Sequence, residues 1–125
     1  MIDRQFEQAK KEEEQQRKEL VHLFGGNVQL HMTIQGKVQG LEFRAFVKHQ
    51  AKKLGLDGWI CNTPTGVELV AEGPETDLNL LRIECAKGPV GAHVEQVQVV
   101  WKKATGEFST FEIHQPLGNP LKCRE

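Results

Sequence analysis

The sequence predicts an α+β domain in which two helices cover one face of an antiparallel sheet. Three observations support this fold class. Apolar and polar residues alternate in several short runs, as they do in half-buried strands. Two further segments carry apolar residues at the spacing of an amphipathic helix. Glycine and proline separate these segments at short intervals, so the elements can be assigned one by one along the chain.

The first strand and the first helix are predicted on either side of a glycine-containing loop. Apolar and polar residues alternate strictly over residues 28–35, which predicts a half-buried strand that is broken by residues 36–40. From Phe43 the period becomes helical. One face of this helix is apolar and consists of Phe43, Phe46, Val47, Ala51 and Leu54. Gly55 lies where a helix commonly ends in a left-handed glycine.

A hairpin, a second helix and a further strand complete the predicted domain. Residues 58–62 and 67–72 are short strands joined by a tight Thr-Pro-Thr-Gly turn. Helical spacing follows over residues 76–86, alternation returns over residues 93–101, and a last short strand covers residues 109–114. The order is β-α-β-β-α-β with an extra edge strand, which is the ferredoxin-like α/β sandwich. Because this fold hosts enzymes, metal carriers and RNA-binding proteins, function has to be argued from the site.

The two ends of the chain differ in composition from this domain. Residues 1–26 are predicted to form a charged helical extension with acid-first pairs such as Glu13 and Arg17. Its polar centre gives it no continuous apolar face, so it is either a solvated helix or an arm that docks a partner or mediates self-association. Residues 116–125 are predicted to be an irregular tail, which leaves residues 27–115 as the functional domain.

Composition and charge argue against several classes of protein. Of 125 residues, 16 are Lys or Arg and 17 are Asp or Glu, and the net charge of −1 argues against a nucleic-acid partner. No apolar run reaches the roughly 18 residues of a membrane span, so no membrane partner is predicted. The three cysteines are widely spaced, which argues against a disulfide scaffold. The five histidines lack the spacing of metal ligands, which argues against a metal site. These histidines are predicted to lie on the surface. These features predict a cytoplasmic protein.

The stretch from Gly36 to Arg44 carries the most chemical information. Two glycines lie in a loop between a strand and a helix, so backbone N–H groups and the helix N-terminus can face one anion. Arg44 in the first helical turn lies at the positive end of the helix dipole, which is unfavourable unless an oxyanion lies there too. Its guanidinium matches the face of a phosphate group. On these residues alone, a plain turn with a solvent-facing, salt-bridged arginine is an equal alternative.

This stretch, G-K-V-Q-G-L-E-F-R, resembles the signature G-x-V-Q-G-V-x-[FY]-R of the acylphosphatase family. The resemblance continues over residues 51–60, where A-K-K-L-G-L-D-G-W-I is similar to the family's A-x-x-L-G-L-x-G-W-V. Asn62 then opens a segment similar to the family's N-x-x-D-G hairpin. The similarity runs from about residue 28 to residue 115, which is nearly the whole predicted domain.

Membership of this family implies an enzyme that hydrolyses the carboxyl-phosphate bond of acyl phosphates, with neither a metal nor another cofactor. The resemblance assigns phosphoryl binding to Arg44 and orientation of the attacking water to Asn62. It also implies a backbone cradle for the phosphate at Gln39, Gly40, Leu41, Glu42 and Phe43. Phosphoryl transfer mainly requires positioning and charge stabilisation, which these residue types supply. The alternative role for Asn62 is to cap its turn through the side chain.

Two residues depart from the family's pattern, and a third brings a charge to a position that the pattern leaves variable. Leu41 replaces a valine, and Thr65 replaces the aspartate before the hairpin glycine, so the turn is affected more than the chemistry. Glu42 places a carboxylate beside the phosphate pocket, where at about 4 Å it would repel the substrate by several kcal/mol unless it points to solvent. The alternative function is therefore a non-catalytic phosphate-binding or protein-interaction module on the same fold.

Overall fold

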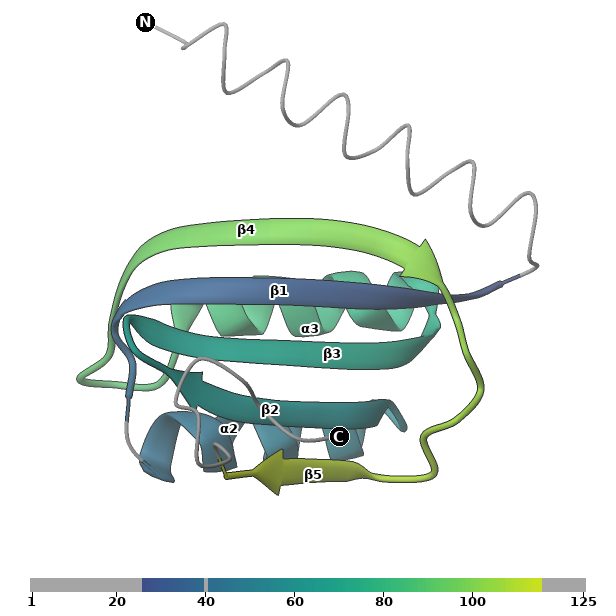
Figure 1. Ribbon diagram of the computed structural model, residues 1–125, viewed down its shortest axis with the longest axis horizontal. Coiled ribbons are helices and arrows are strands. Elements are labelled where there is room, and N and C mark those ends of the chain that lie inside the picture. Colours follow the sequence, from purple (N-terminus) through teal and green to yellow (C-terminus); the bar gives the residue numbers. More distant parts are fainter. Residues whose placement is uncertain (1–25, 40, 116–125) are drawn as a thin grey trace, which may run out of the picture.

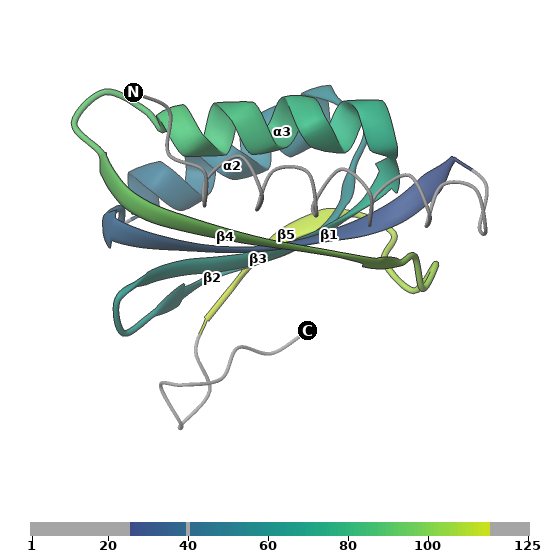
Figure 2. The same ribbon diagram turned by 90° about the horizontal axis from the view of Figure 1, so that it is seen from above.

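The computed structural model describes residues 26–39 and 41–115, which form a five-stranded sheet with helices on one face (Figures 1 and 2). In chain order the elements are β1 (Asn27–Lys37), α2 (Leu41–Lys53), β2 (Asp57–Thr63), β3 (Gly66–Pro74), α3 (Glu75–Lys87), β4 (His93–Lys103) and β5 (Phe111–His114). These elements confirm the ferredoxin-like α+β fold. Apart from Gly26, the extension predicted for residues 1–26 lies outside the described residues, as do its proposed self-association and the tail at residues 116–125.

The strands of the sheet are arranged in the order β4-β1-β3-β2-β5. β1 pairs antiparallel with β3 and β4, and β3 pairs antiparallel with β2. The prediction of an antiparallel sheet is wrong at one edge, because β5 runs parallel to β2. The reason is the connection over residues 104–110, which crosses one end of the sheet from β4 to the far edge (Figure 1). β5 therefore starts at the end of the sheet where β2 also starts.

The hydrophobic core lies between the sheet and the two helices, which share one layer (Figure 2). Alternate side chains of β1 face this layer and are completely buried, namely Val28, Leu30, Met32 and Ile34. Leu78, Leu81 and Cys85 of α3 meet them from the helix side, as helical spacing predicted. Burying a side chain of this size stabilises the fold by roughly 2 kcal/mol. This core holds the ends of β1 and α2 in fixed positions.

Gly36 lies within β1 and not in the following loop, which corrects the sequence assignment. The register of β1 against β4 shifts between Gln35 and Gly36, and Gly36 has a φ of +136°. A Cβ atom at this position would lie 2.2 Å from the carbonyl oxygen of His93, so glycine is required at this bulge. β1 consequently continues to Lys37, one residue beyond Gly36, and α2 begins at Leu41.

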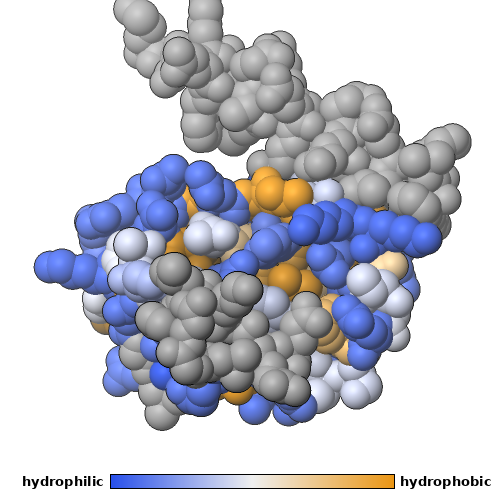
Figure 3. Space-filling model, in the orientation of Figure 1, coloured by the Kyte–Doolittle hydropathy of each residue, from blue (hydrophilic) through white to orange (hydrophobic). Residues whose placement is uncertain are grey.

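The face of the sheet without helices is mainly hydrophilic, with apolar side chains near its centre (Figure 3). Trp59, Cys61 and Val70 form a small second cluster, against which Phe108 packs.

Cys61 is disulfide-bonded, whereas Cys85 is free. Sequence spacing had argued against a disulfide scaffold, but pairing depends on distances in the fold that spacing does not give. In the ranges that the structure describes, no helix has the length and apolar character that a membrane crossing requires.

Candidate active site

The loop between β1 and α2 and the turn between β2 and β3 meet at one end of the sheet (Figure 1). α2 begins at Leu41, directly after the loop. The first N–H groups of a helix have no partner within the helix and face the segment that precedes it. They also lie at the positive end of the helix dipole. This end of the sheet therefore offers backbone donors for an anion.

Hydrogen bonds join the loop to the hairpin. The side chain of Gln39 donates from Nε2 to the carbonyl oxygen of Thr63. The backbone N–H of Gly36 donates to the carbonyl oxygen of Thr65 at 3.2 Å. Gly66 allows this approach, because a Cβ atom there would lie 1.9 Å from the carbonyl oxygen of Ile34. The two segments that carry the predicted site residues are thus fixed against each other.

Arg44 lies in the first turn of α2 and is only 8% exposed. Phe43 beside it and Val47 one turn later are also buried, so the stem of Arg44 lies in the layer between α2 and the sheet. This burial excludes the solvent-facing arginine that the sequence left open. The guanidinium group brings a planar set of N–H donors to the same end of the sheet as the loop.

Asn62 lies near the end of β2, opposite Val67 of β3, and is half-buried. Its neighbour Cys61 belongs to the cluster on the other face of the sheet, so strand alternation turns Asn62 toward the helices. α2 packs against β2 on that side, which places Arg44 and Asn62 on the same face. The side chain that closes the hairpin turn is Thr63, whose Oγ1 accepts the N–H of Gly66 at 3.1 Å.

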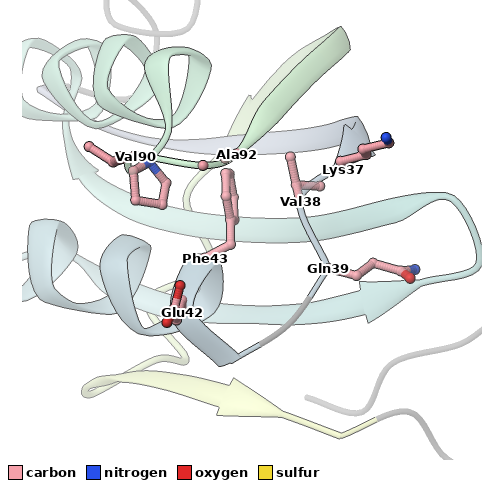
Figure 4. Close-up of a pocket in the computed structure, with 9 residues that line it drawn as sticks. Lys37, Val38, Gln39, Glu42, Phe43, Val90 and Ala92 are labelled. Carbon is pink, nitrogen blue, oxygen red and sulfur yellow. The ribbon is translucent and has the colours of Figure 1, made fainter.

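The residues predicted to cradle a phosphate differ in their surroundings. Gln39 and Glu42 are exposed, and Phe43 is buried. Leu41 is the first residue of α2, and Gly40 lies outside the described residues. Figure 4 shows Gln39 directed toward the hairpin, away from the ring of Phe43. Of these residues, Gln39 and Phe43 thus have different surroundings, and their shared role in binding a phosphate stays a prediction.

Glu42 is exposed and also lies beside a pocket. The sequence had offered two orientations for its carboxylate, one toward the phosphate group and one toward solvent. Glu42 lines this pocket together with Phe43 and with residues 89–92, which form the turn after α3 (Figure 4). The sequence did not predict that residues 89–92 lie next to the loop that leads into α2, because this proximity arises only in the fold.

Two histidines are not the surface residues that the sequence predicted. Nε2 of His31 lies 2.7 Å from Oε2 of Glu68 on the neighbouring strand, and both side chains are half-buried. The ring of His114 stacks on Trp59, with centroids 5.8 Å apart and planes 10° from parallel. Cross-strand neighbours thus cover both rings. Across residues 26–39 and 41–115, no group of three His, Cys, Asp or Glu side chains is arranged to hold a metal ion.

Residues 30–113 match the family model described as Acylphosphatase. The chain belongs to the acylphosphatase family. It is similar to the acylphosphatase of Pyrobaculum islandicum, with 48% identity over 90 residues that cover 70% of this chain and 94% of the relative. The acylphosphatase of Marinobacter nauticus is 44% identical over 82 residues, covering 65% and 89% of the two chains. The crystal structure of the acylphosphatase from Bacillus subtilis matches with a TM-score of 0.65 at 33% identity, covering 69% of this chain and 97% of that one.

These matches identify the chain as an acylphosphatase enzyme and support acyl phosphate hydrolysis as its activity. They cover these two relatives almost from end to end. The matched region includes the loop that leads into α2 and the hairpin that carries Asn62.

Proposed function

We propose that residues 27–115 of this acylphosphatase hydrolyse acyl phosphates, without a metal ion, at the end of the sheet where α2 begins. The observation that carries the proposal is the hydrogen bonding between the loop and the hairpin, from Gln39 to Thr63 and from Gly36 to Thr65. These bonds hold the segment that leads to Arg44 beside the segment that contains Asn62. Two groups from different elements can therefore act on one substrate.

The phosphoryl group binds to the backbone N–H groups between Gln39 and Phe43 and to the guanidinium of Arg44. Because Arg44 is largely buried, its charge acts in surroundings less polarisable than water, which strengthens the interaction. Donors that are held by the fold stabilise the charge of the transition state without reorganisation. In this scheme Arg44 and the backbone donors supply the positive charge for which other phosphoryl-transfer enzymes use a metal.

Asn62 orients the attacking water by accepting one of its hydrogen bonds at Oδ1. The water oxygen forms a bond to phosphorus, the bond between phosphorus and the acyl oxygen breaks, and the electron pair leaves on the carboxylate. A proton of the water passes to a phosphate oxygen, so an acyl phosphate dianion and water give a carboxylate and dihydrogen phosphate. Because the carboxylate is a good leaving group, positioning of the water replaces a strong general base.

Hydrolysis of benzoyl phosphate in the presence of EDTA tests this proposal. The unmodified chain is expected to turn over. Arg44→Ala and Asn62→Ala are each expected to lower kcat/KM by at least about 100-fold, the usual effect of removing a transition-state donor or positioning group. Arg82→Ala and Asn79→Ala change the same residue types on α3, where Asn79 hydrogen-bonds Glu75, and should leave kcat/KM within about twofold.

Two results would contradict the proposal. Loss of activity on adding EDTA would show that a metal takes part. A folded chain that binds inorganic phosphate but hydrolyses no acyl phosphate would favour the non-catalytic phosphate-binding module.

We also propose the cytoplasm as the location of the enzyme, on the grounds of its three widely spaced cysteines. The disulfide at Cys61 argues against this location, because such bonds are rare in reducing compartments, so the redox state of Cys61 in cells tests the proposal. Cells are fractionated after thiols have been blocked with N-ethylmaleimide. Recovery of the protein with Cys61 alkylated, in the cytoplasmic fraction, is the expected result. Recovery in an extracellular fraction with Cys61 oxidised would contradict it.

A further inference from the structure

Cys61 lies on the face of the sheet without helices, and it is disulfide-bonded. The chain contains three cysteines, Cys61, Cys85 and Cys123. Cys85 is free and belongs to the core between α3 and the other face of the sheet. Cys123, which lies outside the described residues, is therefore the one remaining cysteine of the chain with which Cys61 can pair.

The last strand of the sheet ends directly beside Cys61. His114, the final residue of β5, is in register with Cys61 on the neighbouring parallel strand. Because neighbouring strands lie about 5 Å apart, the chain leaves the sheet next to this cysteine. Cys123 is nine positions after His114, and an extended segment of that length spans about 30 Å. The tail at residues 116–125 is therefore long enough to turn and bring Cys123 back to Cys61.

The sequence of the tail favours such a return. Residues 117–121 read Leu-Gly-Asn-Pro-Leu, in which turn-forming residues separate two leucines. A turn at this place reverses the direction of the chain. It also leaves Leu117 and Leu121 with apolar surface to bury, and the second cluster around Cys61 offers apolar surface on a face that no helix covers.

Two buried ring nitrogens beside Cys61 have no hydrogen-bond partner among the described residues, namely Nε1 of Trp59 and Nδ1 of His114. The two rings stack with their centroids 5.8 Å apart, so both nitrogens belong to one part of this face. Buried polar atoms of this kind are usually hydrogen-bonded. The backbone of a segment lying over the rings would supply carbonyl acceptors and N–H donors, and the tail starts at this point of the sheet.

The charges around the two cysteines are complementary. Glu68 of β3 is in register with Cys61, and Glu112 of β5 is in register with its neighbour on the same face, Trp59. Cys123 is flanked in the sequence by Lys122 and Arg124. Basic residues beside Cys123 would therefore meet carboxylates beside Cys61, which favours this pairing by a modest amount.

We propose that the tail at residues 116–125 docks on the helix-free face of the sheet, where a disulfide between Cys61 and Cys123 attaches it. The leucines of the tail cover the second cluster, and its backbone pairs with the ring nitrogens. Formation of the bond oxidises two thiols and reduces one molecule of a small disulfide, such as glutathione disulfide, to two thiols. One sulfur–sulfur bond forms in the protein as that of the oxidant breaks, and two electrons and two protons pass to the oxidant.

Peptide mapping of the full chain tests the pairing. The protein is equilibrated with glutathione disulfide near neutral pH, its free thiols are blocked with N-ethylmaleimide, and it is digested with pepsin at low pH, where thiol exchange stops. The expected product is a peptide pair that joins Cys61 to Cys123 and that dithiothreitol separates. Cys85→Ala is the matched control and should still give this pair, whereas Cys123→Ser should abolish it.

The equilibrium with glutathione tests the docking, because it measures how favourably the unbonded tail brings Cys123 to Cys61. Leu121→Ser should lower the ratio of disulfide to dithiol protein by about tenfold at a fixed ratio of oxidised to reduced glutathione, since the apolar contact of one leucine is lost. Leu80→Ser is the matched control, because Leu80 is 51% exposed on α3, and it should leave the ratio within about twofold.

Each part of the proposal has a result that overturns it. A covalent dimer joined through Cys61, a mixed disulfide of Cys61 with glutathione as the final product, or two cysteines that stay reduced at every glutathione ratio would each disprove the pairing. Equal ratios of disulfide to dithiol protein in Leu121→Ser and Leu80→Ser would disprove the docking, because a tail without contacts would pair equally well with either residue at position 121.

Discussion

Arg44 and Glu72 are both charged side chains of the described region that the fold buries to 8% exposure, and they lie at opposite ends of the sheet. Arg44 lies on the helix-covered face, where β1 leads into α2. Glu72 lies on the other face, near the end at which β4 continues into its connection to β5. Comparing their neighbours separates a charge that holds the fold together from a charge that is proposed to act on a substrate.

The carboxylate of Glu72 is surrounded by donors from the chain itself. Oε2 accepts the side chain of Gln29 at 2.7 Å, and the N–H and hydroxyl of Thr105 at 2.8 and 2.9 Å. Oε1 accepts the N–H of Gly106 at 3.0 Å. These bonds join the connection between β4 and β5 to β3, the central strand of the sheet. Glu72 therefore has a structural role.

Arg44 has a different environment, because the N-terminus of α2 beside it also presents donors. A guanidinium has only donors, so Arg44 and the first N–H groups of the helix suit the anion that is proposed to bind there. Burial alone therefore does not identify a functional charge. The donors of the chain account for the burial of Glu72, whereas the role proposed for Arg44 rests on its place in the first turn of α2.

Replacing the guanidinium while keeping its charge should have the largest effect. Arg44→Lys loses the planar set of donors, so kcat/KM for benzoyl phosphate is expected to fall about 100-fold. The free energy of unfolding, from urea titration, should change by less than about 1 kcal/mol, because the charge and most of the stem are retained. A loss of stability large enough to account for the lost activity would make Arg44 a structural charge like Glu72 and remove the distinction.

Replacing Glu72 should lower stability and leave activity unchanged, which is the opposite of the result expected for Arg44→Lys. In Glu72→Gln an NH2 group would replace one of the two carboxylate oxygens and would face the donors of either Thr105 or Gly106. The expected loss of unfolding free energy is about 2 kcal/mol, typical of hydrogen bonds to a charged acceptor, while kcat/KM of the folded protein is retained. Urea titration and the benzoyl phosphate assay measure the two quantities. Glu107→Gln serves as the exposed control, and equal losses in both variants would argue against the structural role.

The pH dependence of stability gives a smaller effect from the same residue. Burial by itself would raise the pKa of Glu72, but hydrogen bonds from Thr105, Gln29 and Gly106 outweigh it and lower the pKa from its ordinary value of 4.5. A group whose pKa is lowered by folding stabilises the protein above its unfolded pKa, and this contribution is lost as pH falls through the folded pKa. Stability should therefore decrease below about pH 4.5, and it should decrease less steeply in Glu72→Gln. Parallel curves for the two proteins would contradict this assignment.

The sequence was sufficient for features that depend on neighbouring residues. Alternation over residues 28–35 predicted β1, and the Thr-Pro-Thr-Gly segment predicted the hairpin turn, because both depend on local periodicity and turn chemistry. Arg44 was selected as a candidate in the same way, from its place in a continuous motif, and its role stays a proposal. Its burial was not predicted, since that depends on how α2 packs on the sheet.

Features that depend on distant residues could not be read from the sequence. Glu72 was not recognised as a buried anchor, because its partner Thr105 is 33 positions away. The direction of β5 depends on the path of the connection that precedes it. The pocket beside Phe43 depends on the turn at residues 89–92, which the fold brings next to the loop. In each case the missing information is the arrangement of elements in space.

Cys85 is a third buried ionisable group, and it can be compared with Arg44 and Glu72. The effect expected for it is the smallest of those predicted here. Burial among apolar residues of α3, followed by the charge of Glu84, raises the pKa of Cys85 to about 12. Glu72 is also buried, but hydrogen-bond donors surround its carboxylate. Its pKa is therefore lowered, which favours the ionised form. At pH 8 only about one Cys85 thiol in ten thousand is ionised, so iodoacetamide should leave Cys85 unmodified in the native protein and modify it in urea, as judged by peptide mapping. Because a buried thiol reacts only when its helix opens, rapid native labelling would show that α3 separates from the sheet without global unfolding. The packing of Phe43 would then loosen as well, since the turn that contacts its ring follows α3 directly.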